Sequence, residues 1–190
     1  TENVSKVKEP GIVNLALGEA LLRSGREAEA GHALRQALSQ LPDHPRALYL
    51  LGRIAERGGN KAEAKRLYRE SSRRGSVDGD AFARLAQFAA ADKDPRLAIE
   101  MYTSALKYQP RNVTYLNNLA TLLGEEEGRL DDAIRAAQNA YALDPQMPEV
   151  ADTCGWLLFR AGRTREAAAL LEPAANRLKT NAILQFHAGM

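Results

Sequence analysis

The sequence has 190 residues, of which 45% are hydrophobic, 26% are charged and only 6% are aromatic. Its formal net charge of +2 is too small to predict binding to nucleic acid or to an anionic membrane by itself. The single cysteine, Cys154, excludes an internal disulfide but leaves the cellular compartment open. We find no signal peptide and no run of about 18 apolar residues, so we expect no direct membrane insertion.

Small residues recur along the chain with a period of 34 residues, with one interval of 35. A leucine or cysteine followed by glycine or alanine recurs at Leu17-Gly18, Leu51-Gly52, Leu85-Ala86, Leu119-Ala120 and Cys154-Gly155. A second series consists of Ala30, Ala64, Ala98, Ala133 and Ala167. Small side chains at fixed positions let two helices cross closely, and alanine and leucine favour helices. The sequence therefore predicts an all-α protein built from repeated helix pairs.

In chain order, the repeat positions predict a flank, five helix pairs and part of a sixth. The segments are 1–10 (flank), 11–44, 45–78, 79–112, 113–147 and 148–181 (five pairs), and 182–190 (truncated sixth repeat). We expect the chain to be a piece of a longer protein. Because the sixth repeat lacks its second helix, we also expect end-to-end self-association at the C-terminus.

Two repeats depart from the regular pattern. The fourth has one extra residue in the turn between Gly124 and Asp132, where we expect a loop to absorb it. In the fifth, Pro173 falls inside the second helix, where it lacks a backbone donor and clashes with the carbonyl four residues earlier. We therefore predict a kink or break near residues 169–173.

The 34-residue unit, with a Leu-Gly pair, then alanine, then an aromatic such as Tyr68 or Tyr102 and a proline such as Pro42, resembles the tetratricopeptide repeat family. The resemblance covers nearly the whole chain. It implies a right-handed α-solenoid, a superhelix of stacked antiparallel helix pairs whose first helices line a concave groove. It also implies a non-catalytic scaffold that binds another protein or peptide in that groove.

Carried over position by position, the resemblance assigns groove-facing residues to the first helix of each repeat. The predicted partner-binding residues are Tyr49, Arg53, Arg57, Arg84, Gln87, Asn117, Asn118, Thr121, Asp152, Trp156 and Arg160. Leu15, Glu19, Arg23, Arg46 and Phe159 fall on the same wall. Guanidinium groups hold carboxylates, amides pair with extended backbone, and exposed aromatics cover apolar anchors. The aromatic residues either face the groove in this way or pack against the neighbouring first helix.

Two other functions stay open at this point. Lys61, Lys65, Arg69 and Arg73 recur at every fourth residue of one helix, with Arg66 and Arg74 beside them. This basic segment, 61–74, is either a solvated outer face or a docking surface for a polyanion such as nucleic acid. Alternatively, the array regulates an enzyme domain elsewhere in a larger chain.

No residue pattern predicts catalysis, a cofactor or a metal site. His32, His44 and His187 lie in different repeats and lack partners at metal-ligand spacing. Cys154 replaces the usual leucine of the repeat, which indicates a small core residue and not a nucleophile. We therefore expect that the chain is not an enzyme.

The segment 152–174 has a narrower resemblance within the family. It is similar to the repeats of bacterial envelope proteins concerned with exopolysaccharide secretion and outer-membrane assembly. This implies a periplasmic location and a partner in such a complex. Without that resemblance, a cytoplasmic location is the expectation.

Overall fold

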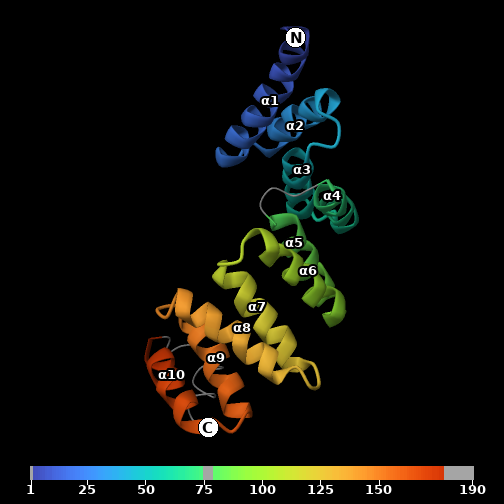
Figure 1. Ribbon diagram of the computed structural model, residues 1–190. Coiled ribbons are helices and arrows are strands. Elements are labelled where there is room, and N and C mark those ends of the chain that lie inside the picture. Colours follow the sequence, from blue (N-terminus) through green and yellow to red (C-terminus); the bar gives the residue numbers. More distant parts are fainter. Residues whose placement is uncertain (1, 75–78, 178–190) are drawn as a thin grey trace. The chain divides into compact units, whose positions relative to one another are not determined.

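The computed structural model describes residues 2–74 and 79–177, which form ten α-helices and no strands (Figure 1). The helices are α1 (Glu2–Arg23), α2 (Glu27–Gln40), α3 (Pro45–Arg57), α4 (Lys61–Arg73), α5 (Asp80–Ala91), α6 (Pro95–Tyr108), α7 (Val113–Glu125), α8 (Leu130–Leu143), α9 (Pro148–Arg160) and α10 (Thr164–Arg177). The chain divides within α5 into two compact units, residues 1–88 and 89–190. The predicted all-α class is confirmed.

In unit 1, α1 packs on α2, α3 packs on α4, and α2 meets α3. Two glycines explain why the paired helices lie so close together. A Cβ atom at Gly18 would lie 2.6 Å from Leu34 Cγ, and one at Gly52 would lie 2.7 Å from Tyr68 Cε1. Each glycine thus leaves the space that a large side chain of the second helix fills.

In unit 2, α7 packs on α8 and α9 packs on α10, while α6 contacts α7 and α8 contacts α9. The same arrangement recurs here, since a Cβ atom at Gly155 would lie 2.7 Å from Leu171 Cγ. The core between these helices consists of small and aliphatic residues, including Ala120, Ala137 and Leu157.

The turn inside each helix pair has one residue with positive φ at the same repeat position. These residues are Gly25, Gly59, Lys93, Gly128 and Gly162. Their spacing is 34 residues except between Lys93 and Gly128, where the repeat has its extra residue. The loop 126–129 between α7 and α8 is one residue longer than the loop 92–94, so a loop absorbs the insertion as expected.

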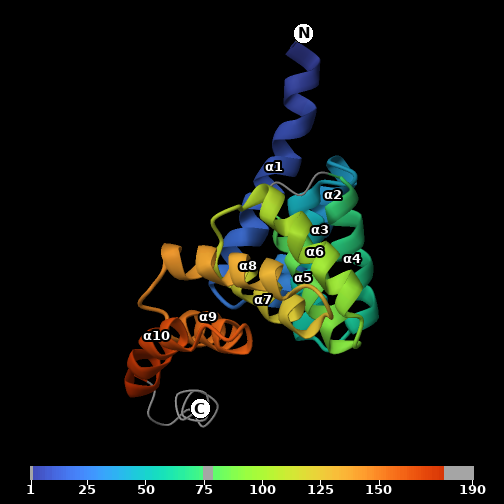
Figure 2. The same ribbon diagram turned by 60° about the horizontal axis from the view of Figure 1, so that its bottom comes forward.

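Helix α1 differs from the expected first helix of repeat one. It begins at Glu2, inside the predicted flank 1–10, and its first turns extend beyond α2 (Figures 1 and 2). Its signature leucine, Leu17, is 47% exposed, whereas the equivalent Leu51 is 8% exposed. Leu51 lies where α2 meets α3, but no described helix covers the corresponding side of α1.

Helix α10 runs without interruption from Thr164 to Arg177 and contains Pro173. We predicted a kink or a break near residues 169–173; the break is wrong, and the kink stays a prediction. Ala169, whose carbonyl would have bonded to residue 173, and Pro173 itself are both exposed, so water can satisfy the free carbonyl. The predicted self-association falls on residues 182–190, which lie outside the described residues.

Cys154 is a core residue that is 1% exposed, and its burial raises the pKa of its thiol to about 11. Because burial disfavours the thiolate, the stability due to the neutral thiol is fully present below about pH 9 and is lost as the pH rises through 11. We expect a loss of about 2–3 kcal/mol over this range. Urea titrations of wild type and Cys154→Val, which has no thiol to ionise, will measure it. A constant difference between the two proteins from pH 8 to pH 11 would contradict the assignment.

Candidate partner-binding site

A pocket of about 340 Å³ lies between α1 and α3 in unit 1. Its lining residues are Glu19, Leu22, Arg23, Arg46, Leu50, Arg53 and Arg57. On α3, the lining positions 46, 50, 53 and 57 follow the helical repeat, so their side chains share one face. We call this feature the arginine pocket, because four arginines and one glutamate supply its charges.

Two of the four arginines are held by acidic residues. Arg46 Nε donates a hydrogen bond of 2.8 Å to Glu19 Oε1, and the Arg46 guanidinium lies 5.5 Å from the centre of the Tyr49 ring. Arg57 Nη1 donates a hydrogen bond of 2.6 Å to Glu27 Oε1. These contacts hold two guanidinium groups of α3 in place and neutralise part of the charge of the pocket.

The other two arginines are free to bind a ligand. Arg23 and Arg53 make no ion pair with any residue that the structure describes. They face the same pocket across the apolar side chains of Leu22 and Leu50. A guanidinium group binds a carboxylate through two parallel hydrogen bonds, so this pocket suits an acidic side chain next to an apolar one.

Tyr49 is not the exposed groove residue that we expected from the sequence. It is only 7% exposed, and its ring lies 5.7 Å from that of Tyr68. Its burial, and next the charge of Asp80, raises the pKa of its hydroxyl. The expectation that Tyr49 faces water is therefore wrong, because its ring packs against Tyr68 of α4, the second helix of the same repeat.

Arg84 and Gln87 form a second group on α5. Arg84 Nη1 donates a hydrogen bond of 3.0 Å to Gln87 Oε1 and lies 3.9 Å from Glu56 Oε1. The Arg84 side chain is 37% exposed, and Gln87 is exposed. Both can be reached by a partner, but neither lines the arginine pocket.

The amide residues of α7 are engaged within unit 2. Asn118 Nδ2 donates to the Tyr102 hydroxyl at 2.9 Å, and the Thr121 hydroxyl donates to the Asn117 carbonyl at 3.1 Å. The Asn117 side-chain oxygen is buried and accepts no hydrogen bond within the described part of the chain. Of these three residues, only Thr121 is fully exposed.

The predicted residues of α9 are more buried than a binding surface requires. Asp152 is 9% exposed, while Trp156 and Phe159 are half-buried and stack with ring centres 5.7 Å apart. Arg160 is exposed, but its Nη1 donates a hydrogen bond of 2.6 Å to the Gly124 carbonyl. Arg160 therefore links α9 to α7 in addition to facing solvent.

The predicted residues thus gather in separate groups, and the arginine pocket contains two of them, Arg53 and Arg57. Sequence reasoning missed Leu22 and Leu50, the apolar residues between the arginines. The spacing could have indicated them: Leu22 follows Glu19 by three residues and Leu50 follows Arg46 by four, which places each leucine on the same helix face as the charged residue.

Several charges of the basic segment 61–74 are compensated by neighbouring groups. Arg66 binds Glu63 and Glu70 on its own helix, and Arg74 Nη2 lies 2.8 Å from Asp43 Oδ2. Lys65 Nζ lies 5.3 Å from the centre of the Phe88 ring. The remaining exposed cations, Lys61, Arg69 and Arg73, are spread along the helix, and none of them lines the pocket that Arg66, Glu63 and Glu70 line.

The described residues hold no cluster of three histidine, cysteine or acidic side chains able to bind a metal ion. Within the same part of the chain, every helix is too short or too polar to span a bilayer.

Comparison with known families gives matches to tetratricopeptide repeat models over residues 15–78 and 79–148, and to a further such model over 125–187. The chain belongs to the tetratricopeptide repeat family. Its fold is accordingly an all-α solenoid of helix pairs. Proteins with tetratricopeptide repeats generally mediate protein–protein interactions, and their fold is typically a non-catalytic scaffold.

Two relatives are similar to part of this tetratricopeptide repeat chain. A TPR repeat-containing protein of Pseudomonas aeruginosa is 26% identical over 84% of the chain. Small glutamine-rich tetratricopeptide repeat-containing protein 2 of Saccharomyces cerevisiae is 33% identical over 42% of the chain. The matched regions are only 27% and 22% of the lengths of these two relatives.

Solved structures with the same tetratricopeptide repeat fold include YrrB, described as a TPR protein with an unusual peptide-binding site. YrrB is 19% identical, with a TM-score of 0.77 over 100% of this chain and 97% of its own. MamA gives a TM-score of 0.70 at 17% identity over 92% of this chain and 94% of its own. At these identities, the comparison establishes the fold alone.

Proposed function

We propose that this chain is a non-catalytic scaffold that binds an acidic segment of a partner polypeptide in the arginine pocket. The observation that carries the proposal is the pair Arg23 and Arg53, which face one pocket without an acidic partner among the described residues. Half-buried Leu22 and buried Leu50 lie beside them and form the apolar floor of the pocket. Membership of a family that generally mediates protein–protein interactions supports a polypeptide as the ligand.

Arg46 and Arg57 support the same proposal through their existing contacts. Their ion pairs with Glu19 and Glu27 hold the guanidinium groups in place before a ligand arrives. A partner that binds such a prepared pocket loses less entropy than one that has to order it. Within the same unit, Arg84 and Gln87 remain available for weaker contacts with the partner.

The test uses the full chain and a fluorescein-labelled peptide in which glutamates alternate with leucines. We expect Arg23→Glu combined with Arg53→Glu to weaken binding at least tenfold, because two attractive charges become repulsive. Fluorescence anisotropy at two salt concentrations measures the loss. Circular dichroism will show that the variant keeps its helices, since both residues lack ion pairs in the described structure.

The matched control is Lys61→Glu combined with Arg69→Glu, which reverses two exposed charges on α4 outside the arginine pocket. We expect this variant to bind the peptide almost as well as the wild type. If the control variant lost binding and the pocket variant kept it, the basic segment 61–74 would be the docking surface. Strong binding of double-stranded DNA by the wild type, lost in the control variant, would favour the nucleic-acid alternative.

We further propose that the partner belongs to a bacterial envelope complex. The resemblance of the segment 152–174 to the repeats of envelope proteins supports this. Crosslinking in cells of the source organism, with the full-length protein, tests it. We expect crosslinks to proteins of polysaccharide secretion or outer-membrane assembly. Crosslinks to cytoplasmic proteins alone, or to a catalytic domain of the same chain, would contradict the envelope setting.

A further inference from the structure

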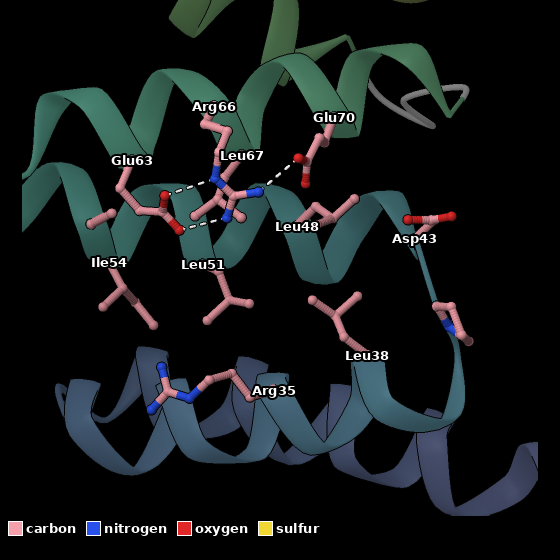
Figure 3. Close-up of a pocket in the computed structure, with 12 residues that line it drawn as sticks. Arg35, Leu38, Asp43, Leu48, Leu51, Ile54, Glu63, Arg66, Leu67 and Glu70 are labelled. Carbon is pink, nitrogen blue, oxygen red and sulfur yellow. Dashed lines mark hydrogen bonds and ion pairs between the residues drawn. The ribbon is translucent and has the colours of Figure 1, made fainter.

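A second pocket of unit 1, with a volume of about 580 Å³, lies between α2, α3 and α4 (Figure 3). Its lining residues are Arg35, Leu38, Pro42, Asp43, Leu48, Leu51, Ile54, Ala55, Glu63, Arg66, Leu67 and Glu70. None of these residues lines the arginine pocket. We call it the leucine pocket.

The two pockets use different faces of α3. Leu48, Leu51 and Ile54 face the leucine pocket, whereas Arg46, Leu50 and Arg53 face the arginine pocket. Since each residue turns the helix by about 100°, the two sets point in clearly different directions. A ligand in one pocket therefore does not occupy the other.

The floor of the leucine pocket is apolar and partly open to solvent. Leu48, Leu51 and Leu67 are 4%, 8% and 6% exposed, while Leu38 and Ile54 are only half-buried. Figure 3 shows Leu38 rising from α2 toward the leucines of α3. The volume lies in the range of about 300–1,000 Å³ that is typical of ligand pockets.

All acidic groups of the leucine pocket already have cationic partners. Arg66 Nε and Nη2 donate to the two carboxylate oxygens of Glu63 at 2.8 and 2.7 Å, and Arg66 Nη1 donates to Glu70 Oε1 at 2.7 Å. Asp43 pairs with Arg74. Since Glu63 and Glu70 share one arginine, this cluster of the α4 wall keeps a net negative charge and would repel a carboxylate of a ligand.

Arg35 on the opposite wall is different. It lies one helical turn before Leu38 on α2, is exposed, and forms no hydrogen bond or ion pair with any residue in the described ranges. Figure 3 shows its side chain on the α2 side, across the leucines from the Arg66 cluster. Arg35 is therefore the one charged side chain of this lining without an oppositely charged partner among the described residues, so a carboxylate of a ligand can pair with it.

We propose that the leucine pocket is a second polypeptide-binding site, which takes a segment with a leucine-sized side chain followed closely by a single carboxylate. The apolar side chain fills the space between Leu38, Leu51 and Ile54, and the carboxylate binds the Arg35 guanidinium. The pocket lies between helices with exposed rim residues, which suits a chain passing over it. The proposal does not require a ligand in the arginine pocket.

The experiment is a titration of ¹⁵N- and methyl-labelled full chain with the acetylated, amidated peptide Gly-Leu-Leu-Asp-Gly, up to millimolar concentration. We expect chemical-shift changes at the methyl groups of Leu38, Leu51 and Ile54. The matched peptide with asparagine in place of aspartate should bind about tenfold more weakly, because the charge-assisted contact is lost. Arg35→Gln should cause a similar loss for the aspartate peptide and none for the asparagine peptide.

Two variants separate this site from the arginine pocket. Leu38→Gln, at a half-buried position, should reduce binding of both peptides while retaining the helical spectrum. Arg53→Gln should leave the shifts at Leu38 and Ile54 unchanged. The proposal is overturned if the leucine-pocket methyl groups do not shift, if Arg35→Gln binds both peptides as the wild type does, or if Arg53→Gln removes the shifts. The last result would assign the peptide to the arginine pocket instead.

Discussion

Replacing Tyr68 with alanine is expected to lower the free energy of unfolding by about 3–5 kcal/mol. The Tyr68 side chain is fully buried and fills the space beside Gly52 between α3 and α4. Its ring also lies 5.7 Å from that of Tyr49 and 6.3 Å from that of Phe88, so its removal leaves a cavity that three helices line. Urea denaturation followed by circular dichroism measures the loss, and hydrogen exchange should place it in α3 and α4.

Tyr68→Phe is the matched control for this prediction, because it keeps the ring and removes only the hydroxyl. That hydroxyl donates a hydrogen bond of 2.7 Å to Glu56 Oε2, a carboxylate that is partly exposed. We expect a smaller cost of about 1–2 kcal/mol, since water can replace the lost donor. Equal losses for the two variants would mean that the hydrogen bond, and not the ring, holds this helix pair together.

Replacing Gly155 with valine is expected to destabilise unit 2 by about 3 kcal/mol or more. The added Cβ would lie 2.7 Å from Leu171 Cγ and 3.3 Å from the Ala167 carbonyl oxygen. The leucine can shift only at the cost of its own packing, and the backbone carbonyl cannot move without bending α10. Thermal and urea unfolding of the variant measure the effect.

Two further variants show whether overlap with Leu171 is the cause. Ala169→Val adds a β-branched side chain at an exposed position of α10 and should cost only about 0.5 kcal/mol. The double variant Gly155→Val, Leu171→Ala should lose less than the sum of its single changes, with a coupling of about 0.5–3 kcal/mol. Strict additivity would rule out the contact as the source of the loss.

The helix pairs could be predicted from the sequence because their closest contacts are local. Gly18, Gly52 and Gly155 each meet a large residue 16 positions later, at Leu34, Tyr68 and Leu171. Such a contact depends only on two helices and the short turn between them, so it recurs wherever the repeat does. The positive-φ residue of each turn, such as Gly59, recurs for the same reason.

Features that depend on neighbouring side chains could not be predicted in this way. Tyr49 occupies a groove position by spacing, but the ring of Tyr68 and the guanidinium of Arg46 cover it. The effect of Pro173 depended on exposure, because a lost helix hydrogen bond costs less where water replaces it. Neither circumstance can be read from a residue and its repeat position alone.

The candidate site was predictable only in part. Spacing placed Arg53 and Arg57 on the first helix of their repeat, and both line the arginine pocket. The spacing could not show that Arg57 is paired with Glu27 while Arg53 has no acidic partner among the described residues. The Arg57–Glu27 pair joins residues that are 30 positions apart in the sequence. The leucine pocket escaped prediction because its residues come from three helices and belong to no single periodic face.

The pairing of a glycine with a bulky residue 16 positions later bears on how such arrays can be recombined. Gly52 fits Tyr68, while Gly18 fits Leu34, so these two hairpins each carry a small residue matched to their own large residue. Chimeras that exchange whole hairpins should therefore keep their internal fit. Exchanging a single helix would place a tyrosine where the partner helix leaves room only for a leucine. The hairpin is therefore the smallest unit that can be exchanged when new arrays are built from this chain.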